Sequence, residues 1–247
     1  MSIIIRGLRK AYNGDVLFKG LSIRAQKGRI TAVFGPNGCG KTTLFNILSG
    51  IARQDGGDYD IRGFDRFRFS YMFQDYRESL LPWRNNFDNI ALPLQIQDIS
   101  KEGISERIKA LMGSFDFRLD LDGYPYELSG GQQQFLAFLR SLVTSPNILL
   151  LDEPFSALDY ENSIRLRNSL QAYHMSEGST IFIITHDIEE AVYLASDIIV
   201  LSRRPTRVLG RIKNPIPYPR TSETLQSREF HDVKNKVLQL FHSEVGL

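Results

Sequence analysis

The sequence predicts an α/β fold with a largely parallel central sheet and one helical insertion. Strands that are buried on both faces form uninterrupted apolar runs, and three such runs are present: Arg29–Phe34, Ile148–Leu151 and Thr180–Thr185. A helical pattern follows each of them, at Thr42–Ser49, Glu161–Tyr173 and Ile188–Ala195. Strands that alternate with helices in this way are typical of α/β proteins.

Residues 75–135 follow a different pattern. Apolar side chains between Ile104 and Phe115 fall on one helical face, and no strong strand pattern is present. We therefore expect a mostly helical insertion over these residues. Further along the chain, the proline-rich stretch 205–219 predicts a boundary, and Ser227–Phe241 predicts a terminal helix.

The composition is that of an ordinary globular protein. The chain has 247 residues, a formal net charge of +2 and 42% hydrophobic residues, which suits one large domain and excludes a disordered tail or a fibrous repeat. Cys39 is the single cysteine, which excludes a disulfide scaffold and favours a reducing compartment. We expect no membrane span, because no apolar run approaches the roughly 18–20 residues required, and no secretion signal.

The small net charge conceals an uneven distribution. Residues 1–34 carry seven basic groups and one acidic group, and residues 203–220 carry six basic groups and no acidic group. Between them, residues 35–202 carry 14 basic and 23 acidic groups. The two basic stretches either bind a charged partner, such as lipid headgroups, or form solvated surface.

A glycine-rich segment follows the first predicted strand. Residues Gly35–Thr42 match the pattern glycine, any four residues, then Gly-Lys-Thr. Glycines let backbone N–H groups approach phosphate oxygens, and the positive N-terminal end of the next helix faces the same anion. We expect Lys41 to neutralise charge on the β and γ phosphates, and the Thr42 hydroxyl to bind Mg²⁺.

Two carboxylates, Asp152 and Glu153, end the apolar run at Leu151. A parallel strand carries such residues to the sheet edge at which the phosphate loop also lies. Asp152 suits coordination of Mg²⁺, and Glu153 suits a base that polarises the attacking water. Without the phosphate loop, the pair would be interpreted as an ordinary strand end.

The segment Leu128–Gln132 predicts a second anion site. Ser129, Gly130 and Gly131 offer a hydroxyl and backbone N–H groups just before a predicted helix. One phosphate loop already holds a triphosphate, so a second anion site in the same chain has a use if it serves a nucleotide bound by another copy.

In this order, the motifs resemble those of ATP-binding cassette (ABC) transporter ATPases over roughly residues 3–210. The resemblance implies a P-loop NTPase (RecA-like) core with an antiparallel β subdomain and an inserted α-helical subdomain. Residues 1–247 would form a single ABC ATPase domain. Its nucleotide-binding core would span 1–74 and 136–210, its helical subdomain with the signature motif 75–135, and its C-terminal extension 211–247.

The resemblance also implies catalytic and metal-binding residues. Glu153 matches the catalytic glutamate of the Walker B strand, and His186 matches the switch histidine. Gln74 takes the place of the Q-loop glutamine, which contacts Mg²⁺ and senses the transmembrane partner. The expected metal ligands are Thr42, Gln74 and Asp152.

The expected nucleotide-binding residues come from the Walker A loop, the signature, the D-loop and an adenine-stacking aromatic. They are Tyr12, Gly35, Pro36, Asn37, Gly38, Cys39, Gly40, Lys41, Thr42, Thr43, Ser129, Gly130, Gly131, Gln132 and Asp159. Two alternatives stay open at this point: Tyr12 as a packed core aromatic, and Gln74 as a polar strand end. Cys39 stands where serine is common in the family. It is either a neutral substitution or a reactive thiol, because a helix N-terminus can lower a cysteine pKa.

Cofactors and partners are implied by the same resemblance. ATP and Mg²⁺ would bind between two copies of the chain, paired head to tail around two ATP molecules. Transmembrane permease subunits would be direct partners and a solute-binding protein an indirect one, with no nucleic acid. The chain would lie peripherally on the cytoplasmic face of the cell membrane.

Less universal segments indicate the transporter type. Leu80–Trp83 resembles the corresponding segment of importers for nitrate, sulfonates, taurine and related small molecules, and Ser202–Pro205 resembles the end of that group. Two residues depart from the group: Thr206 replaces a glycine, and Phe135 stands where arginine is common. Trp83 is expected either to contact the membrane subunit or to cap the core of the helical insertion.

Three other classes fit the sequence less well. An exporter ATPase would suit the length but not Leu80–Trp83. A non-transport ABC ATPase usually has paired cassettes or long coiled-coil insertions, for which 247 residues leave no room. A kinase or GTPase with a phosphate loop would have no use for Leu128–Gln132. The sequence therefore favours the ATPase subunit of an importer for a small solute.

Overall fold

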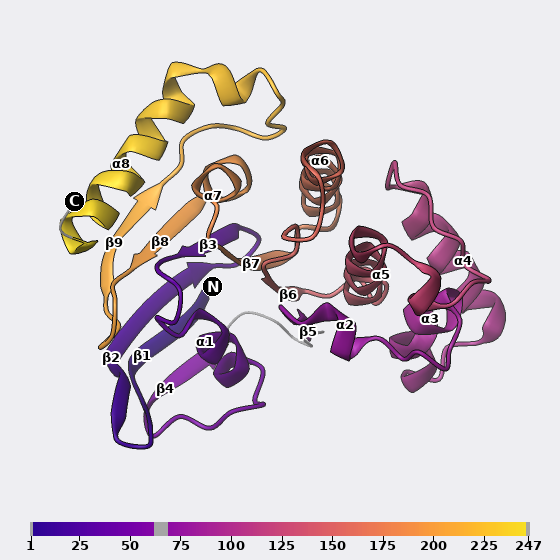
Figure 1. Ribbon diagram of the computed structural model, residues 1–247, viewed down its shortest axis with the longest axis horizontal. Helices are drawn as coiled ribbons and strands as arrows, with labels where there is room; N and C mark the ends of the chain where they lie inside the picture. The colour runs from indigo at the N-terminus through magenta and orange to yellow at the C-terminus, as the bar shows by residue number, and fades with distance from the viewer. Residues whose placement is uncertain (1, 62–68, 246–247) are drawn as a thin grey trace.

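The computed structural model describes residues 2–61 and 69–245, so the parts of the expected segments at Met1, 62–68 and 246–247 lie outside the described residues. Figure 1 shows a central sheet with helices above it, a smaller sheet below it and a separate group of helices at one end. The α/β fold with its helical insertion is confirmed.

The central sheet has the strand order β5-β6-β7-β3-β8-β9. In that order, the strands span Phe69–Met72, Ile148–Asp152, Thr180–Thr185, Ile30–Phe34, Asp197–Leu201 and Val208–Lys213. The first five run parallel, and β9 is antiparallel to β8. β3, β6 and β7 are buried along their whole length, as their uninterrupted apolar runs predict.

Alternate residues of the central strands belong to two hydrophobic cores, because successive strand side chains point to opposite faces. On β3, Ile30 and Ala32 belong to the core that includes residues of α6 (Tyr160–Glu177) and α7 (Ile188–Leu194). Val33 instead belongs to the core that includes α1 (Lys41–Leu48) and the smaller sheet. α1 therefore lies between the two sheets, with its N-terminus just beyond the end of β3 (Figure 1).

The smaller sheet is the antiparallel β subdomain that the resemblance implies. Its strands β1 (Ser2–Tyr12), β2 (Asp15–Gln26) and β4 (Gly56–Ile61) pair in the order β2-β1-β4. Irregular register on both sides of β1 interrupts the alternation of apolar and polar residues, which hides these strands from a simple sequence pattern. At Gly57, with φ of +80°, a Cβ would collide with the backbone of Gly7, so only glycine fits there.

Helices occupy the insertion, as its pattern predicts. They are α2 (Tyr76–Ser79), α3 (Asn86–Ile96), α4 (Lys101–Gly113), the short 3-10 turn Pro125–Glu127 and the first part of α5 (Gly130–Leu142). Phe135 of α5 is fully buried, and its ring centroid lies 4.3 Å from that of Phe117 and 5.8 Å from that of Phe115. This aromatic cluster explains why phenylalanine stands where arginine is common.

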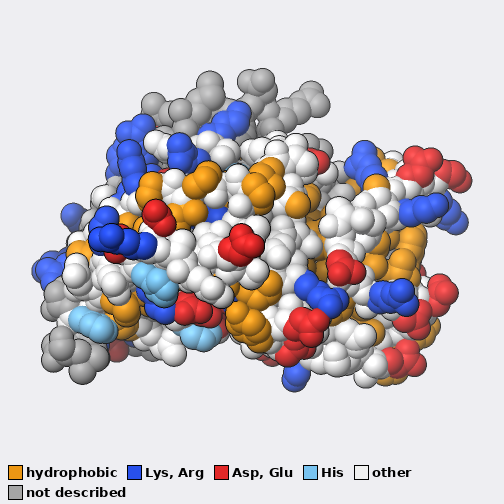
Figure 2. All heavy atoms as spheres, turned by 90° about the horizontal axis from the view of Figure 1, so that it is seen from above, with side chains coloured by type: hydrophobic (Ala, Val, Ile, Leu, Met, Phe, Trp, Pro, Cys, Tyr) orange, Lys and Arg blue, Asp and Glu red, His pale blue; other side chains and the backbone are white. Residues whose placement is uncertain are grey.

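The basic stretch 203–220 is not a uniform charged surface. Figure 2 shows many Lys and Arg side chains at the end of the molecule opposite the helical insertion, and both charge signs over the insertion itself. Within the stretch, however, the Arg211 guanidinium pairs with Asp197 of β8 at 3.0 Å, and Arg220 is buried. Arg220 is therefore not available to a partner, and Arg211 is already paired within the fold although its side chain stays partly exposed.

Arg220 fastens the segment after β9 to the core. Its Nη1 donates hydrogen bonds to the carbonyl oxygens of Val192, Tyr193 and Ala195 at the end of α7, at 2.7, 3.0 and 2.9 Å. Its Nη2 donates to the Ile216 carbonyl at 2.8 Å. The guanidinium thus satisfies carbonyls that a helix C-terminus leaves unpaired.

The expected C-terminal extension is continuous with the central sheet and its helices. The expected boundary at residues 210 and 211 falls within β9, which pairs with β8. α8 (Arg228–Val245) then packs on the same core through Phe230, Val233 and Val237. Within residues 2–61 and 69–245, the helices are too short or too polar for one to span a bilayer.

We predict that Arg220→Met destabilises the protein by roughly 3 kcal/mol, because it removes the buried donors to Tyr193 and Ile216 and leaves Val192 and Ala195 with the Asn214 side-chain amide. Urea unfolding followed by circular dichroism measures the change. Arg203→Met, on an exposed side chain of the same segment, is the matched control and should change the free energy of unfolding by about 0.5 kcal/mol or less. Equal stabilities of the two variants would contradict the anchoring role of Arg220.

Candidate functional site

The glycine-rich segment forms the turn between β3 and α1. Gly38 and Gly40 have φ angles of +76° and +98°, a backbone region that other residues rarely adopt. A Cβ at Gly40 would also lie 2.9 Å from the Leu17 side chain. The glycines therefore let the loop fold tightly at the start of α1.

Lys41 is held across this loop. Its ammonium Nζ donates to the carbonyl oxygens of Gly35 at 2.9 Å and Pro36 at 3.1 Å, and its side chain is buried. Gly40, just before the helix, has no side chain that could cap the first N–H groups of α1. The helix N-terminus and the Lys41 charge together favour an anion at this point.

A cavity of about 360 Å³ opens over the loop. Its lining residues are Asn37, Gly38, Gly40, Lys41, Thr42, Thr43, Gln74, Glu153, His186 and Arg204. The sequence predicts all of them as site residues except Arg204, which comes from the β8–β9 loop. Distant parts of the chain therefore meet at one edge of the central sheet.

Asp152 lies at the end of β6 and is almost fully buried. Burial raises the pKa of its carboxyl group to about 6. One oxygen, Oδ2, lies 3.5 Å from the Tyr71 hydroxyl, while Oδ1 has no hydrogen-bond partner among the described residues. A buried carboxylate oxygen that lacks a partner suits a hard cation such as Mg²⁺.

Glu153 and His186 form a direct contact. Nδ1 of His186 lies 3.2 Å from Oε1 of Glu153. The Glu153 backbone has a φ of +50°, unusual for a residue other than glycine, and its N–H donates to the Ile184 carbonyl of β7 at 2.9 Å. The backbone thus turns the carboxylate towards the cavity and the histidine.

A buried polar network holds Thr185 and Asp187, the residues on either side of His186. The Thr185 hydroxyl donates to Glu190 at 2.5 Å and accepts from the Asp187 backbone N–H at 3.0 Å. The other Glu190 oxygen accepts from the Arg167 guanidinium of α6 at 2.7 Å. Burial raises the pKa of Glu190, and the Arg167 charge opposes that shift. No motif in the sequence indicates this network.

Gln74 lies just after β5, beside the phosphate loop. Its Oε1 is 3.5 Å from the Thr42 hydroxyl oxygen, and its side chain lines the cavity. Because Gln74 lines the cavity, its position favours the interpretation as a site residue over that of a polar strand end. Together with the Asp152 carboxylate, these oxygen atoms form the donor set expected for Mg²⁺.

Tyr12 ends β1 on the smaller sheet. Its ring is 49% exposed, with the Lys10 ammonium 4.9 Å from the ring centroid. It is therefore not a packed core aromatic: one face of the ring carries the Lys10 ammonium, and about half of the residue is exposed to solvent. The structure does not place it in the lining of the phosphate-loop cavity.

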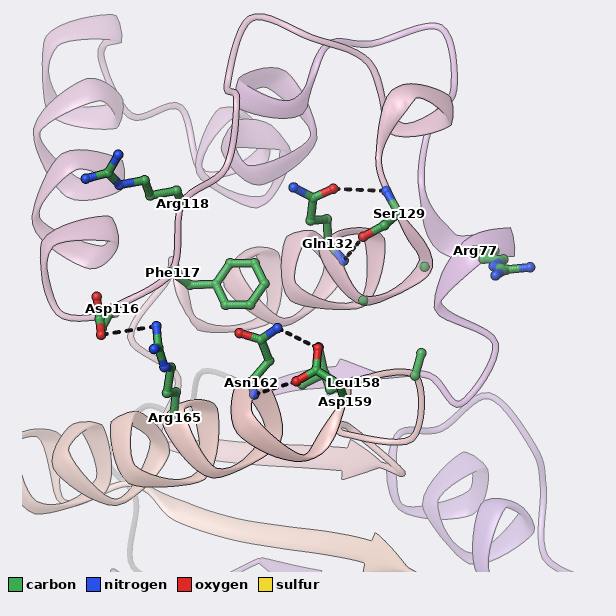
Figure 3. Close-up of a pocket in the computed structure, with 13 residues that line it drawn as sticks. Arg77, Asp116, Phe117, Arg118, Ser129, Gln132, Leu158, Asp159, Asn162 and Arg165 are labelled. Carbon is green, nitrogen blue, oxygen red and sulfur yellow. Dashed lines mark hydrogen bonds and ion pairs between the residues drawn. The ribbon is translucent and has the colours of Figure 1, made fainter.

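The signature segment begins α5. The Ser129 hydroxyl accepts from the Gln132 backbone N–H at 3.3 Å, and the Gln132 side chain accepts from the Ser129 N–H at 3.0 Å (Figure 3). This reciprocal cap fixes the helix start. In this cap, the Gln132 side-chain oxygen is already bonded to the Ser129 N–H. Gly130 and Gly131 form the first turn of the helix.

Asp159 lies close to the signature segment. It caps α6 by accepting from the backbone and side chain of Asn162 at 3.0 and 2.7 Å, and these hydrogen bonds lower the pKa of its carboxyl group (Figure 3). Both motifs line a second, open cavity of about 820 Å³. Its lining residues are Arg77, Asp116, Phe117, Arg118, Ser129, Gly130, Gly131, Gln132, Ala157, Leu158, Asp159, Asn162 and Arg165.

Gln134 is a site residue that motif analysis misses. It is fully buried in α5, and its side-chain amide donates to the Glu153 carbonyl at 3.0 Å and accepts from the Ala157 N–H at 2.9 Å. The helix that follows the signature segment is therefore bonded to the backbone of Glu153, just beyond the end of β6. Its place in a run of three glutamines gives no signal for this role.

Cys39 does not fit the hypothesis of a reactive thiol. It is buried under the loop, and this burial raises the pKa of its thiol, although the nearby charges of Lys41 and Arg204 oppose the shift. Because the thiolate is the reactive form, the structure favours the alternative of a neutral substitution for serine.

The Leu80–Trp83 segment forms a loop between α2 and α3, with Leu80 buried in the core and Pro82 and Trp83 exposed. Asn89 folds this loop: its side chain accepts from the Leu81 N–H at 2.9 Å and donates to the carbonyls of Leu81 and Arg84 at 3.0 and 3.1 Å. Trp83 is 72% exposed. It therefore does not cap the core of the insertion, and it presents a large apolar surface to solvent.

The fold and the cavity over the glycine-rich loop define a P-loop nucleotide-binding protein. Residues 18–156 match the family model described as ABC transporter, and the chain belongs to that family. Its activity is the ATP hydrolysis of the family, with ATP as substrate.

Relatives with similar sequences cover most of the chain. An aliphatic sulfonates import ATP-binding protein, SsuB, from Bacillus cereus is 34% identical over 255 aligned residues, 98% of this chain and 96% of the relative. An uncharacterized ABC transporter ATP-binding protein from Methanocaldococcus jannaschii is 34% identical over 232 residues, 91% of this chain and 84% of the relative.

Solved structures of a bacterial ABC transporter cassette, MJ0796, have the same fold. Its dimeric structure matches with a TM-score of 0.76 and 26% identity, covering 85% of this chain and 98% of that chain. A dimeric post-hydrolysis state of the same cassette, bound to ADP and Pi, matches with a TM-score of 0.75 and 25% identity over the same shares.

We predict that Cys39 in the native protein reacts with iodoacetamide at least about tenfold more slowly than in the urea-unfolded chain, because the thiol is buried and protonated at neutral pH. Mass spectrometry measures the extent of alkylation. ATPase activity should be unchanged after treatment of the native, nucleotide-free protein, as in the thiol-free control Cys39→Ser. Rapid alkylation with loss of activity would restore the hypothesis of a reactive thiol.

Proposed function

We propose that this chain is the ATP-hydrolysing subunit of an importer that takes up a small solute, such as a sulfonate, nitrate or a related molecule. The observation that carries the proposal is the cavity in which the phosphate loop, Gln74, Glu153 and His186 meet. The sulfonate-import relatives and the Leu80–Trp83 loop, with its exposed Trp83, support the import direction.

In this proposal, the triphosphate binds along the phosphate loop. Backbone N–H groups from Gly38 to Thr43 and the N-terminus of α1 donate to phosphate oxygens. Lys41, already directed across the loop by Gly35 and Pro36, supplies a positive charge. The Tyr12 ring stacks on the adenine.

Thr42, Gln74 and Asp152 would hold Mg²⁺. They fit that ion because each offers an oxygen, and because the buried Oδ1 of Asp152 has no other partner among the described residues. When bound, Mg²⁺ neutralises charge on the β and γ phosphates. Occupancy would also keep the Asp152 carboxyl group ionised despite its raised pKa.

Glu153 would polarise the water that attacks the γ-phosphate. Its carboxylate accepts a proton at Oε1 or Oε2, and His186, 3.2 Å away, orients it. The hydrogen-bond network of Thr185, Glu190 and Arg167 would hold the backbone next to His186 in place. In this proposal, the water polarised by Glu153 would attack in line a γ-phosphate that the phosphate loop holds.

A second copy would complete the site. Ser129, Gly130 and Gly131 line a cavity whose lining is separate from that of the phosphate-loop cavity, so one chain does not bring the two together. Two copies paired head to tail would close the signature cavity of one over the phosphate loop of the other. The dimeric cassette structures of the family support this arrangement.

Coupling to transport would occur at the cytoplasmic face of a membrane, through permease subunits supplied with solute by a binding protein. Trp83 is the apolar contact that we assign to a permease subunit, because it is exposed on a loop that follows Gln74 closely. No nucleic-acid partner is proposed. An exporter or a non-transport ATPase is not favoured by the relatives that match.

The catalytic assignment is tested by Glu153→Gln. We predict preserved ATP binding and a loss of hydrolysis of about 10²–10³-fold, because the amide cannot accept the proton from water. ATP affinity by calorimetry and phosphate release measure the two effects. Glu106→Gln, on the exposed face of α4, should hydrolyse ATP normally. Hydrolysis by Glu153→Gln within tenfold of wild type would exclude Glu153 as the base.

The permease contact is tested by Trp83→Ala. We predict that solute uptake into proteoliposomes holding the complete transporter falls at least about tenfold, because the aromatic anchor that would be buried against the permease is removed. The ATPase rate of the isolated subunit should change less than twofold. Met175→Ala, an exposed apolar residue on α6, should affect neither. A parallel loss of uptake and isolated ATPase activity would show that Trp83 serves packing.

A further inference from the structure

The loop between β8 and β9 contacts the phosphate loop through an arginine that no motif predicts. Nε of Arg204 donates to the Gly38 carbonyl oxygen at 2.5 Å. The same side chain lines the phosphate-loop cavity, together with residues such as Lys41 and Glu153. A second cation is therefore present where a polyanion is expected to bind.

The backbone on both sides of Arg204 is fixed in place. Thr206 is buried; its N–H donates to the Leu17 carbonyl at 2.7 Å and its hydroxyl to the Cys39 carbonyl at 2.6 Å. The Ser202 hydroxyl accepts from the Arg207 N–H at 2.9 Å, which closes the base of the loop. The loop thus holds Arg204 over Gly38 without need of the guanidinium contact.

This anchoring also explains one departure from the importer group. A glycine at position 206 would lack the hydroxyl that donates to Cys39. With threonine, two successive carbonyls of the phosphate loop, those of Gly38 and Cys39, accept hydrogen bonds from one neighbouring loop. The β8–β9 loop therefore packs against the phosphate loop and is hydrogen-bonded to its backbone.

The Arg204 guanidinium retains donors for a ligand. The Gly38 carbonyl uses only Nε, and among the described residues the two Nη groups have no hydrogen-bond acceptor. Guanidinium Nη groups match the spacing of phosphate oxygens and bind them in pairs. Arg204 is exposed and lines the cavity, so a bound phosphate chain can approach its Nη groups.

We propose that Arg204 is a further nucleotide-binding residue, whose Nη groups contact the phosphate chain of ATP or ADP bound to the same copy of the chain. The proposal rests on the proposed function of the phosphate-loop cavity. The Nε contact to Gly38 aims the guanidinium, and Lys41 and Arg204 then act on the polyphosphate from two different elements.

Arg204→Gln separates the two contacts of this side chain. The glutamine Nε2 stands at the same number of bonds from the backbone as the arginine Nε, so it can still donate to Gly38, but it lacks the charge and the Nη donors. We expect about tenfold weaker binding of both ATP and ADP, measured by calorimetry, from loss of a charge-assisted contact. KM for ATP should rise in proportion, with kcat within about threefold of wild type.

Two further variants complete the test. Arg203→Gln removes an equal charge from the adjacent, exposed position and should bind both nucleotides as wild type does. Arg204→Lys keeps the charge and should recover part of the affinity. Raising the salt concentration should reduce the difference between wild type and Arg204→Gln, because a contact at an exposed cation is screened.

Wild-type affinity of Arg204→Gln for ATP and ADP would overturn the proposal, even if hydrolysis fell, since that result assigns Arg204 to the Gly38 contact or to the second copy. Equal losses in Arg203→Gln and Arg204→Gln would also overturn it, because they reflect bulk charge alone. Failure of the wild-type protein to bind or hydrolyse ATP would instead reject the proposed function. The two failures are therefore distinguishable.

Discussion

The functional geometry depends on the level at which the parallel strands end. Phe34, the last residue of β3, pairs with Thr185 of β7 and Val200 of β8, and Asp152 of β6 pairs with Ile184. Because the strands end at the same height along the sheet, the phosphate loop, Asp152, Glu153 and His186 all lie at one edge of it. A one-residue shift of register would turn each strand's buried set to the opposite face, so the two cores fix the site.

Because the site lies at the ends of buried apolar strands, its charged groups are poorly solvated. The strands that carry it are apolar and buried, and the burial that stabilises them raises the pKa of Asp152 to about 6. Bulk charge does not compensate, since residues 35–202 are net acidic. The compensation is local: the Lys41 charge, directed by two carbonyls, opposes the rise in the Asp152 pKa, whereas the neighbouring Glu153 charge adds to it, and α1 supplies its N-terminus.

The sequence was sufficient to predict what is encoded locally. The phosphate loop is recognisable because its conformation demands glycines at Gly38 and Gly40, and the central strands because burial on both faces demands apolar runs. Gln134 was missed, and the contact of Arg204 could not be derived from its segment, because their partners lie 19 and 166 residues away along the chain. The strands of the smaller sheet were missed individually because irregular register breaks their alternation.

The C-terminal segment joins the site by the same kind of long-range contact. Lys234 of α8 pairs with Glu189 of α7 at 2.6 Å, and α7 begins directly after His186. At the other end of α7, the Arg220 guanidinium holds the last carbonyls. Both ends of this short helix are therefore held by residues that follow β9. Since the next residue of α7, Glu190, is bonded to Thr185 and to Arg167 of α6, the position of His186 is determined jointly by the core and by the C-terminal segment.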